Sequence, residues 1–558
     1  MYRTHNCGEL HIKHVNIQVM LCGWIDEIRN FGSIFFIDIR DYFGITQLVV
    51  HKNLIKKKLK KEFLIKIYGK VVERYSKNHK LKTGDIEVLI NKIEILNKSI
   101  TTPFIIKNNT DGKEKERMIY RYLDIRRPNI KENLIFRHKI VLEIRNFLSS
   151  KNFIEIETPI LINNTPEGAR SFIVPSRRYK DKFYALPQSP QIFKQLLMIG
   201  GIDKYFQIAK CFRDEDPRSD RQIEFTQLDC EMAFVDIKNI LNFFEDFIKY
   251  LFKINNIQFL KSFPCISYNE AIKKYGTDCP DIRFGMKFFY LKNIINEKNI
   301  NFLKDKEIII GIKVKDFFSK KNHNKINLFL EKIKNSNLIW IKHSIDKKFF
   351  ISKEKHISEK NIHIISNYFN TNPGDFIFIS YGEKNIAINL LKKIRSEIID
   401  ILSKKNKNIK LFEPIWIINH PLFKWNNKRY KSVHHPFTSP IDEDINLLKT
   451  TPENIRSKSY DLVINGVEIA SGSIRIYDKK IQKIIFNHLG LSKKEIQSNF
   501  GFFIKALKYG APPHGGIAFG LDRIVNLLKG ENDIKNFIAF PKNNFGKDLM
   551  TNSPSIIK

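Results

Sequence analysis

The sequence predicts a multidomain α+β protein: a small N-terminal β-barrel, a larger part built on an antiparallel sheet with flanking helices, and an inserted α+β domain. The chain has 558 residues, which exceeds the size of one ordinary domain. Short strand patterns fill the chain up to about residue 105, and motif-rich segments then continue to about residue 285 and resume after Phe412. Because 42% of the residues are apolar, the chain has material for several cores and is not expected to be disordered.

Residues 1–105 are expected to form an OB-type barrel. Five segments have the composition of short strands, separated by turns rich in Gly, Asn and Lys: QVMLCGWIDEIRN, SIFFIDIRD, GITQLVVH, FLIKIYGKVVER and DIEVLINKIEIL. A small closed barrel of this kind commonly binds single-stranded nucleic acid. The aromatic residues Trp24, Phe31, Phe35 and Phe36 are core residues by default, and base stacking is the alternative.

The remaining segments complete the predicted organisation. Residues 106–133 are polar and are predicted to be a hinge. In residues 134–284, apolar positions at helical spacing (Ile140, Ile144, Phe147, Leu148) lead into an alternating strand, FIEIETP, that stops at Pro159. Residues 285–410, rich in Lys, Asn and Ile but with a buried strand GDFIFIS, are predicted to be the inserted domain, and residues 411–558 complete the interrupted one.

The charge favours a polyanionic partner. Ninety-five Lys and Arg against 59 Asp and Glu give a net charge of +36, although part of this excess follows the Lys-rich and Asn-rich composition of the whole chain. The six cysteines form no C-x-x-C pair, which fits free thiols in a reducing compartment. The N-terminal segment lacks a signal-peptide core, and no apolar run approaches the roughly 20 residues of a membrane span. A cytoplasmic protein without membrane contact is therefore expected.

The segment from Phe212 to Asp229, FRDEDPRSDRQIEFTQLD, is the first candidate site. A charged loop joins two strands, and the second strand places Gln227, Asp229 and Glu231 on one face. A charged loop is usually a solvated turn, but polar groups on a strand face near a core need partners, which a polar ligand supplies. Arg213 is suited to grip a phosphate or carboxylate, and Glu215 to accept from an amine.

The segment from Tyr460 to Tyr477, YDLVINGVEIASGSIRIY, is predicted to be a hairpin around Asn465-Gly466. Pairing of Val463 with Glu468 places Asp461 and Glu468 on one face, where two carboxylates suit a divalent cation. Arg475 lies an odd number of positions from Glu468, so a regular strand would point it away. We therefore predict a β-bulge at the Ser471-Gly472 step that returns Arg475 to this face.

The segment PPHGGIAFGLDRIVNLL is predicted to be a glycine-rich strand that ends at Gly520 and leads into a helix with Arg523 in its first turn. Small residues let the backbone approach a flat ligand, and the guanidinium can stack on a purine or bind phosphate. Such a strand–helix joint is often only a packing feature. Two further segments, TPEGAR and QSPQIFK, add polar candidates, and the pair His434–His435 fits hydrogen bonding to a substrate, or structure, better than a metal site.

Together these elements resemble the class II aminoacyl-tRNA synthetases, and TPEGAR, QSPQIFKQLLM, KCFRDED, HHPFTSP and PPHGGIAFGLDR are similar to the bacterial aspartyl branch of that family. The resemblance covers nearly the whole chain. It implies ligation of L-aspartate to tRNA(Asp) through an aspartyl-adenylate, with ATP as substrate, Mg²⁺ as cofactor and a homodimer as assembly. It is compatible with charging of tRNA(Asp) alone or of tRNA(Asn) as well.

The resemblance also implies residue roles. Catalysis would use Arg213, Glu468 and Arg523. Aspartate would be bound by Glu167, Ser189, Gln191, Lys194, Arg213, Asp229, His434 and Arg475. ATP would be bound by Arg213, Asp214, Glu215, Gln222, Glu468, Gly520, Leu521, Asp522 and Arg523, and Mg²⁺ by Asp461 and Glu468. In the barrel, Arg29, Phe36, Gln47 and Glu87 would contact the anticodon.

Four positions depart from the pattern of related bacterial sequences: Asn30 stands where Asp is common, and Ala470, Ser471 and Tyr477 alter the usual GGGSxRIH string. Two rival functions remain. An asparaginyl-tRNA synthetase would share the scaffold, but Lys194 and Arg475 favour a carboxylate substrate over an amide. A non-catalytic RNA-binding relative would have no need for Arg213, Glu468 and Arg523.

Overall fold

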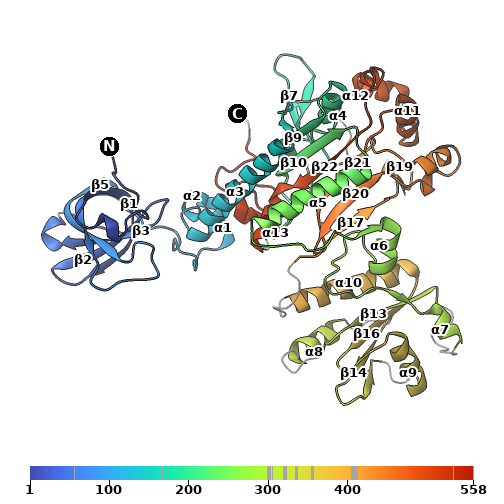
Figure 1. The fold of residues 1–558 in the computed structure, drawn as a ribbon, viewed down its shortest axis with the longest axis horizontal. Coiled ribbons are helices and arrows are strands. Elements are labelled where there is room, and N and C mark those ends of the chain that lie inside the picture. The colour runs from blue at the N-terminus through green and yellow to red at the C-terminus, as the bar shows by residue number, and fades with distance from the viewer. Residues whose placement is uncertain are drawn as a thin grey trace. The chain divides into compact units, whose positions relative to one another are not determined.

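The computed structural model describes residues 1–55, 57–164, 168–297, 303, 306–317, 323–333, 337–352, 357–403, 412–531 and 533–556 (Figure 1). The chain divides into two compact units. One comprises residues 1–129 with 549–551, and the other comprises residues 130–548 with 552–558.

In the described part of the first unit, strands close into a barrel in the order β1-β2-β3-β5-β4. The strands are β1 (Gln18–Asn30), β2 (Ile34–Arg40), β3 (Ile45–His51), β4 (Leu64–Glu73) and β5 (Ile86–Asn97), with short 3₁₀ turns η1 (Ile12–His14) and η2 (Lys52–Leu54). Alternate residues such as Ile37, Ile39 and Leu48 are fully buried and fill the barrel. The predicted OB-type barrel is confirmed.

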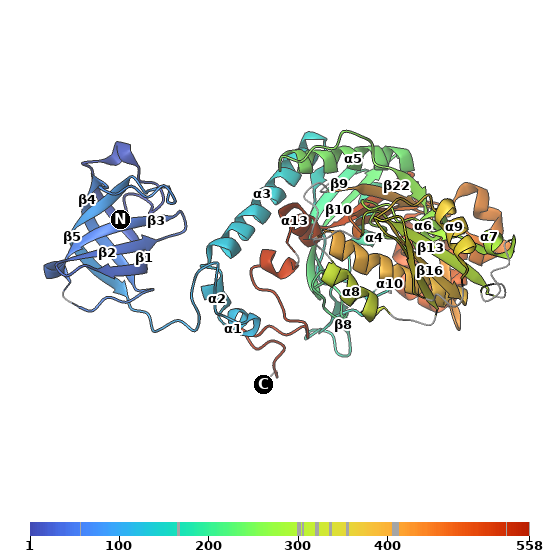
Figure 2. The same ribbon diagram turned by 90° about the horizontal axis from the view of Figure 1, so that it is seen from below.

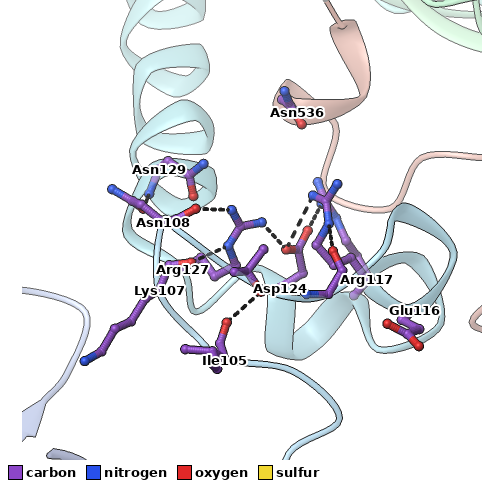
Figure 3. A network of polar contacts seen from close by, with 12 residues as sticks. Ile105, Lys107, Asn108, Glu116, Arg117, Asp124, Arg127, Asn129 and Asn536 are labelled. Atoms are coloured by element: carbon purple, nitrogen blue, oxygen red, sulfur yellow. Dashed lines mark hydrogen bonds and ion pairs between the residues drawn. The ribbon is translucent and has the colours of Figure 1, made fainter.

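The segment after the barrel is held by a buried ionic network around Asp124 (Figure 3). It contains two short helices, α1 (Glu114–Ile119) and α2 (Arg121–Asp124). The fully buried Asp124 carboxylate accepts from Arg127 Nη1 at 2.7 Å and from Arg121, and Arg127 in turn donates to the carbonyl oxygens of Lys107 and Asn108, both at 2.9 Å. The polar composition of the predicted hinge therefore reflects ordered charge pairing.

The second unit is organised around a sheet of order β11-β17-β20-β21-β22-β10-β9-β6. Its strands are β6 (Ile154–Glu155), β9 (Lys204–Phe212), β10 (Glu224–Ala233), β11 (Cys265–Ser267), β17 (Pro414–Ile418), β20 (Ser459–Ile464), β21 (Val467–Ile474) and β22 (His514–Gly520). The neighbours pair antiparallel except at β11–β17 and β6–β9, which are parallel. The predicted antiparallel sheet with flanking helices is confirmed.

One face of this sheet is apolar and is covered by helices. Helices α3 (Pro128–Ser150) and α5 (Ile237–Lys253) lie side by side over it (Figure 2). Phe147 of α3 contacts Phe247 of α5, with ring centres 5.4 Å apart. Helix α13 (Leu521–Lys529) contributes to the same core. Along β10, Leu228 and Cys230 enter this core, so the alternate residues must point to the opposite face. That opposite face carries the site described below.

The other elements flank this sheet. The helices are α4 (Gln191–Ile199), α6 (Tyr268–Tyr275), α11 (Lys479–His488) and α12 (Lys493–Ala506), with 3₁₀ turns η6 (Asp442–Lys449), η7 (Pro452–Asn454) and η8 (Ile534–Phe537). Two small hairpins are formed by β7 (Ile173–Pro175) with β8 (Phe183–Ala185), and by β18 (Phe423–Asn426) with β19 (Arg429–Ser432).

The inserted segment forms a second sheet of order β12-β13-β16-β14-β15 with helices on both faces. Its strands are β12 (Phe289–Tyr290), β13 (Ile308–Val314), β14 (Leu338–His343), β15 (Phe349–Ile351) and β16 (Phe376–Gly382), and its helices are α7 (Lys292–Glu297), α8 (His323–Lys332), α9 (Glu359–Tyr368) and α10 (Lys384–Ser403). Residues of α8 and α10 pack on one face and residues of α9 on the other. The predicted buried strand GDFIFIS corresponds to β16, and the inserted α+β domain is confirmed.

The hairpin β20–β21 confirms one prediction and corrects another. Asn465 and Gly466 have φ angles of 54° and 80°, and Ile464 pairs with Val467 as expected. The predicted bulge at Ser471-Gly472 is wrong, because the ladder is regular there. The bulge is at Ile469, since Leu462 pairs with Ala470 while Val463 pairs with Glu468.

The bulge at Ile469 nevertheless has the predicted consequence for the strand faces. Asp461 pairs with Ser471 and Val463 pairs with Glu468, so the extra residue places Glu468 and Ser471 on one face. Alternation from Ser471 then brings Arg475 to that face as well. Without Ile469, Glu468 and Arg475 would point to opposite sides.

Candidate active site

A cavity of about 300 Å³ opens on the polar face of the large sheet. Its lining comes mainly from β10, β21, α4, the start of α13 and the loop between β9 and β10. The sequence-predicted residues in the lining are Ser189, Gln191, Lys194, Arg213, Glu215, Gln222, Asp229, His434, Glu468, Arg475, Gly520, Asp522 and Arg523. The fold thus gathers residues from distant segments of the chain around one polar pocket.

Four buried charged side chains meet at this pocket: Lys194, Asp229 and Arg475 line it, and Glu231 contacts two of them. Lys194 Nζ lies 2.9 Å from Asp229 Oδ1 and 3.2 Å from Glu231 Oε2. Arg475 holds Glu231 in a fork, with Nε–Oε1 at 2.8 Å and Nη2–Oε2 at 3.0 Å. All four are at most 1% exposed, so these are charge pairs shielded from water.

The two carboxyl groups respond differently to this environment. Burial raises the pKa of Asp229, and Lys194 only partly opposes the effect. Burial also works against ionisation of Glu231, but Arg475 and Lys194 outweigh it and lower its pKa to about 2. Glu231 is therefore ionised near neutral pH, and Asp229 Oδ2 is buried without a hydrogen-bond partner among the described residues.

A glycine makes room for this cluster. A Cβ atom at Gly516 on β22 would collide with the Glu231 carboxylate and with the Cys230 carbonyl oxygen. The string PPHGGIAFG therefore needs glycine beside β10 so that Glu231 can reach both cations.

The other end of the pocket carries arginines suited to an anionic, planar ligand. The Arg213 guanidinium lies 5.1 Å from the centre of the Phe225 ring. Arg523 donates to the Glu468 carbonyl oxygen at 2.7 Å and pairs with Asp220 at 3.2 Å. Glu215 pairs with Arg221 at 2.6 Å in the loop after β9. This end combines fixed positive charge with an aromatic surface, which fits a nucleoside triphosphate.

Gln222 is also positioned at this end. Its Oε1 accepts from the backbone N–H of Lys542 at 2.9 Å, while Nε2 is buried without a partner among the described residues. A buried amide with one free donor group is suited to hydrogen bonding with a polar ligand.

Asp461 and Glu468 fit a divalent cation. Burial and the nearby Asp461 charge raise the pKa of Glu468 to about 7, although Arg523 and Arg213 oppose the shift. Asp461 Oδ1 is buried and has no hydrogen-bond partner in the described part of the chain. Two acidic groups that repel each other in a buried site are stabilised by a cation held through their oxygens.

Some predicted residues do not line the cavity. Glu167 lies outside the described residues. Asp461 is buried behind the pocket wall, and Asp214 lies in a loop 3.8 Å from Arg170. The Leu521 side chain is part of the hydrophobic core. Asp522 faces the pocket, but its carboxylate is already occupied by Arg137 and by the backbone N–H of Thr226.

Residue-by-residue assignment from the sequence did not include every residue around the pocket. Gln227 and His435 line the cavity and Glu231 lies against it, and both Glu231 and His435 contact Arg475. The Gln-x-Asp-x-Glu alternation in β10 already placed Glu231 on the correct face, and that signal was available. The structure also shows that Lys194 and Arg475 are both paired with protein carboxylates, so counting cations alone does not select a carboxylate substrate.

The four barrel candidates lie together on the outer face of the barrel. Arg29 pairs directly with Phe36, and Asp38 pairs with Gln47, so these positions share one face of β1, β2 and β3. Gln47 accepts from Arg29 at 3.0 Å and donates to Glu87 on β5 at 2.7 Å. The arrangement presents an aromatic ring beside prearranged polar groups.

The departing positions have separate structural roles. Asn30 Oδ1 accepts from the Gly32 N–H at 3.0 Å and shapes the β1–β2 turn. Ala470 is buried in the core, and Tyr477 is half exposed outside the cavity. Ser471 lies in the cavity wall, with Oγ 3.2 Å from His434 Nδ1.

Comparison with known proteins agrees with this arrangement. The family model described as tRNA synthetases class II (D, K and N) matches residues 113–544, and the OB-fold nucleic acid binding domain matches residues 19–96. The aspartate–tRNA ligase of Amoebophilus asiaticus is 46% identical over 570 residues, covering 100% of this chain and 98% of the relative. That of Azobacteroides pseudotrichonymphae is 47% identical over 569 residues, covering 100% and 97%.

Solved structures share the fold at lower sequence identity. The asparaginyl-tRNA synthetase of Entamoeba histolytica with asparaginyl-adenylate has a TM-score of 0.60 at 19% identity and covers 97% of both chains. A putative aspartyl-tRNA synthetase from Leishmania major has a TM-score of 0.58 at 18% identity, covering 96% of this chain and 92% of its own. Among the described residues, no helix combines the length and apolar character needed to cross a membrane.

Proposed function

The chain belongs to the class II aminoacyl-tRNA synthetases, in their aspartate-specific branch, and on that premise we propose how its residues carry out the reaction. The enzyme joins L-aspartate to tRNA(Asp) in two steps. An aspartate carboxylate oxygen attacks the α-phosphorus of ATP and releases pyrophosphate. A terminal ribose hydroxyl of the tRNA then attacks the aspartyl carbonyl of the adenylate and releases AMP. The observation that carries this function is the identity of 46–47% to aspartate–tRNA ligases along the whole chain.

The buried charge cluster would bind the amino acid. We assign the substrate ammonium to Asp229, because its Oδ2 is buried and without a partner among the described residues. We assign the side-chain carboxylate to Lys194 and Arg475, whose positions Glu231 fixes from behind. Ser189, Gln191 and His434 would complete the pocket wall, with Glu167 assigned by resemblance. The two cations and two carboxylates of the cluster balance one another, so net charge alone does not select the substrate. Aspartate is selected because its ammonium and carboxylate groups must each lie opposite a group of the other sign.

The arginine-rich end would bind ATP. Arg213 would bridge the substrate carboxylate and the α-phosphate, and Arg523 would face the purine or the phosphates. The nucleotide would be held by Glu215, Gln222 and the end of β22 at Gly520. It would be supported indirectly, through the backbone or neighbouring side chains, by Asp214, Leu521 and Asp522. These groups position the reactants and stabilise charge, so no protein nucleophile is required.

Asp461 and Glu468 would hold Mg²⁺ through carboxylate oxygens. When bound, the ion neutralises phosphate charge during displacement of pyrophosphate. The raised pKa of Glu468 and the unpartnered Oδ1 of Asp461 support this assignment.

Each part of the chain would have a separate role. Residues 1–105 would bind the anticodon through Arg29, Phe36, Gln47 and Glu87. Residues 106–133 would join the barrel to the catalytic domain, formed by residues 134–284 and 411–558, with residues 285–410 inserted. The six cysteines are free thiols, which supports a cytoplasmic enzyme.

A homodimer is supported by exposed apolar side chains on α3 and just after it. Leu142 on α3 is 46% exposed, and Ile154, Ile160 and Leu161 after it are 50–52% exposed. Sedimentation equilibrium tests this directly: a dimer is expected, and a monomer at micromolar concentration would contradict it.

ATP–pyrophosphate exchange with aspartate and with asparagine tests the central reaction, followed by charging of purified tRNA(Asp) and tRNA(Asn). Aspartate-dependent exchange and charging of tRNA(Asp) are expected. Exchange with asparagine alone would favour the asparaginyl alternative, and no exchange with either amino acid would favour a non-catalytic relative. Charging of both tRNAs would show the relaxed specificity.

A further inference from the structure

A second group of potential ligands lies behind the wall of the active-site cavity. Two histidines and a carboxylate (His420, His434 and Asp461) each offer one ligand atom, and these atoms all lie within 4.8 Å of one another. Asp461 belongs to β20, while His420 follows β17 and His434 follows the β18–β19 hairpin. The residues are therefore brought together only by the folded sheet and its adjoining loops.

Local backbone geometry turns His420 toward β20. Asn419 adopts a left-handed conformation with φ of 58°, which Asn tolerates better than most residues. The Ser457 N–H donates to the His420 carbonyl oxygen at 2.7 Å and fixes the loop against the start of β20. His420 is 2% exposed, and its ring centre is 4.7 Å from that of His434, with the rings nearly perpendicular.

Each of the three side chains has a buried polar atom without an ordinary partner. His420 Nε2, His434 Nε2 and Asp461 Oδ1 are all buried without a hydrogen bond in the described part of the chain. His420 Nε2 lies 3.1 Å from Asp461 Oδ2, close enough for an ion pair but without hydrogen-bond alignment. Burial of three such atoms in one place is costly unless a ligand satisfies them.

The opposite ring nitrogens are already engaged. His420 Nδ1 lies 3.1 Å from Ser459 Oγ, which in turn lies 2.8 Å from Ser457 Oγ. His434 Nδ1 lies 3.2 Å from Ser471 Oγ, at one of the positions that depart from the family pattern. A histidine whose Nδ1–H donates to an oxygen presents the Nε2 lone pair, the arrangement found around metal-binding histidines.

We propose that His420, His434 and Asp461 form a binding site for a borderline divalent cation of the Zn²⁺ type. Two imidazole nitrogens and one carboxylate oxygen match the donor preference of zinc, whereas Mg²⁺ prefers oxygen ligands alone. Ligand atoms around a tetrahedral zinc ion lie about 3.3 Å apart for bonds of about 2.0–2.1 Å, so small side-chain movements would close the site. A water or substrate oxygen would complete the coordination.

The site has a regulatory consequence that rests on the proposed function. Asp461 cannot serve a zinc ion and the nucleotide's Mg²⁺ with the same oxygens, so occupancy by zinc removes one magnesium ligand. Zinc therefore inhibits adenylate formation in competition with Mg²⁺, and a chelator reverses the inhibition.

Direct metal binding to the full-length enzyme, without substrates, tests the site. Zn²⁺ affinity is measured by calorimetry and Co²⁺ binding by visible absorption, for the wild type and for His420→Asn. Asn keeps an amide N–H donor near the Nδ1 position and removes Nε2, so zinc affinity is expected to fall at least about 100-fold, since even loss of a supporting partner costs about 10–100-fold. His435→Asn is the matched control, because His435 faces Arg475 and should leave this zinc affinity unchanged.

A variant next to the ligands provides a second test of the site. Ser459→Ala keeps all three ligands and should weaken zinc binding by about 10–100-fold, a result that can be obtained even if His420→Asn does not fold. Equal zinc affinity in the wild type and His420→Asn, or a Co²⁺ spectrum with thiolate charge-transfer bands, would overturn the site. Zinc binding without inhibition of ATP–pyrophosphate exchange would overturn the claim that Zn²⁺ and Mg²⁺ compete for Asp461. Absence of exchange in Mg²⁺ alone would instead count against the proposed function and leave the binding result standing.

Discussion

Replacement of Lys194 by Met separates substrate recognition from stability. Lys194 is 1% exposed, and its Nζ lies 2.9 Å from Asp229 and 3.2 Å from Glu231. Removing one partner of a buried ion pair leaves an uncompensated charge and costs about 3–5 kcal/mol. We therefore expect Lys194→Met to lower the free energy of unfolding by that amount, and Lys194→Met/Asp229→Asn to recover at least about 2 kcal/mol of it.

The kinetic effect of Lys194→Met should be confined to the amino acid. Loss of a buried charged contact to the substrate carboxylate costs about 2 kcal/mol or more, which corresponds to a rise of at least about 30-fold in KM for aspartate. The ATP end of the pocket is formed by other residues, so KM for ATP should stay within about 3-fold, the size of a small indirect effect. Both constants come from ATP–pyrophosphate exchange at a temperature where the variant is folded.

A surface lysine provides the control for this experiment. Lys249 pairs with Glu245 at 2.7 Å on α5 and is partly exposed, so Lys249→Met should cost only about 0.3–0.5 kcal/mol and leave both KM values unchanged. Urea unfolding measures the three stabilities. A destabilised Lys194→Met enzyme with an unchanged aspartate KM would refute the role in recognition, because Lys194 would then act only as the partner of Asp229.

Three further outcomes are expected. The pKa of Glu231 is held at about 2, against an ordinary value of 4.5, so its ionisation stabilises the folded protein above pH 4.5 and this stabilisation is lost as pH falls toward 2. Glu231→Gln should lack this pH dependence, which amounts to about 3 kcal/mol in the free energy of unfolding measured by urea titration at each pH. Asp124→Asn should destabilise the N-terminal unit by about 3–5 kcal/mol, because it leaves buried arginines without their carboxylate, and an unchanged unfolding curve for an isolated fragment of residues 1–129 would contradict this. Phe36→Ala should weaken tRNA binding by about 1–3 kcal/mol without changing aspartate-dependent exchange, and equal tRNA affinity in filter binding would exclude stacking by that ring.

The sequence by itself determined the local structure and the chemical class of the site. Strand alternation predicted the barrel, β10 with its Asp229–Glu231 face, and the Asn465-Gly466 hairpin, because these features depend on neighbouring residues along the chain. Family strings then brought Arg213, Glu468 and Arg523 into one expected pocket.

Only the tertiary structure decided how the buried charges are paired. The bulge at Ile469, which brings Arg475 to the same face as Glu468, depends on the pairing of β21 with β20. The pairing of Lys194 with Asp229 and of Arg475 with Glu231 joins α4, β10 and the end of β21, and no spacing in the sequence encodes such contacts. The grouping of His420 with His434 and Asp461 is of the same kind, because each residue comes from a different segment and their separation is set by the packing of the sheet.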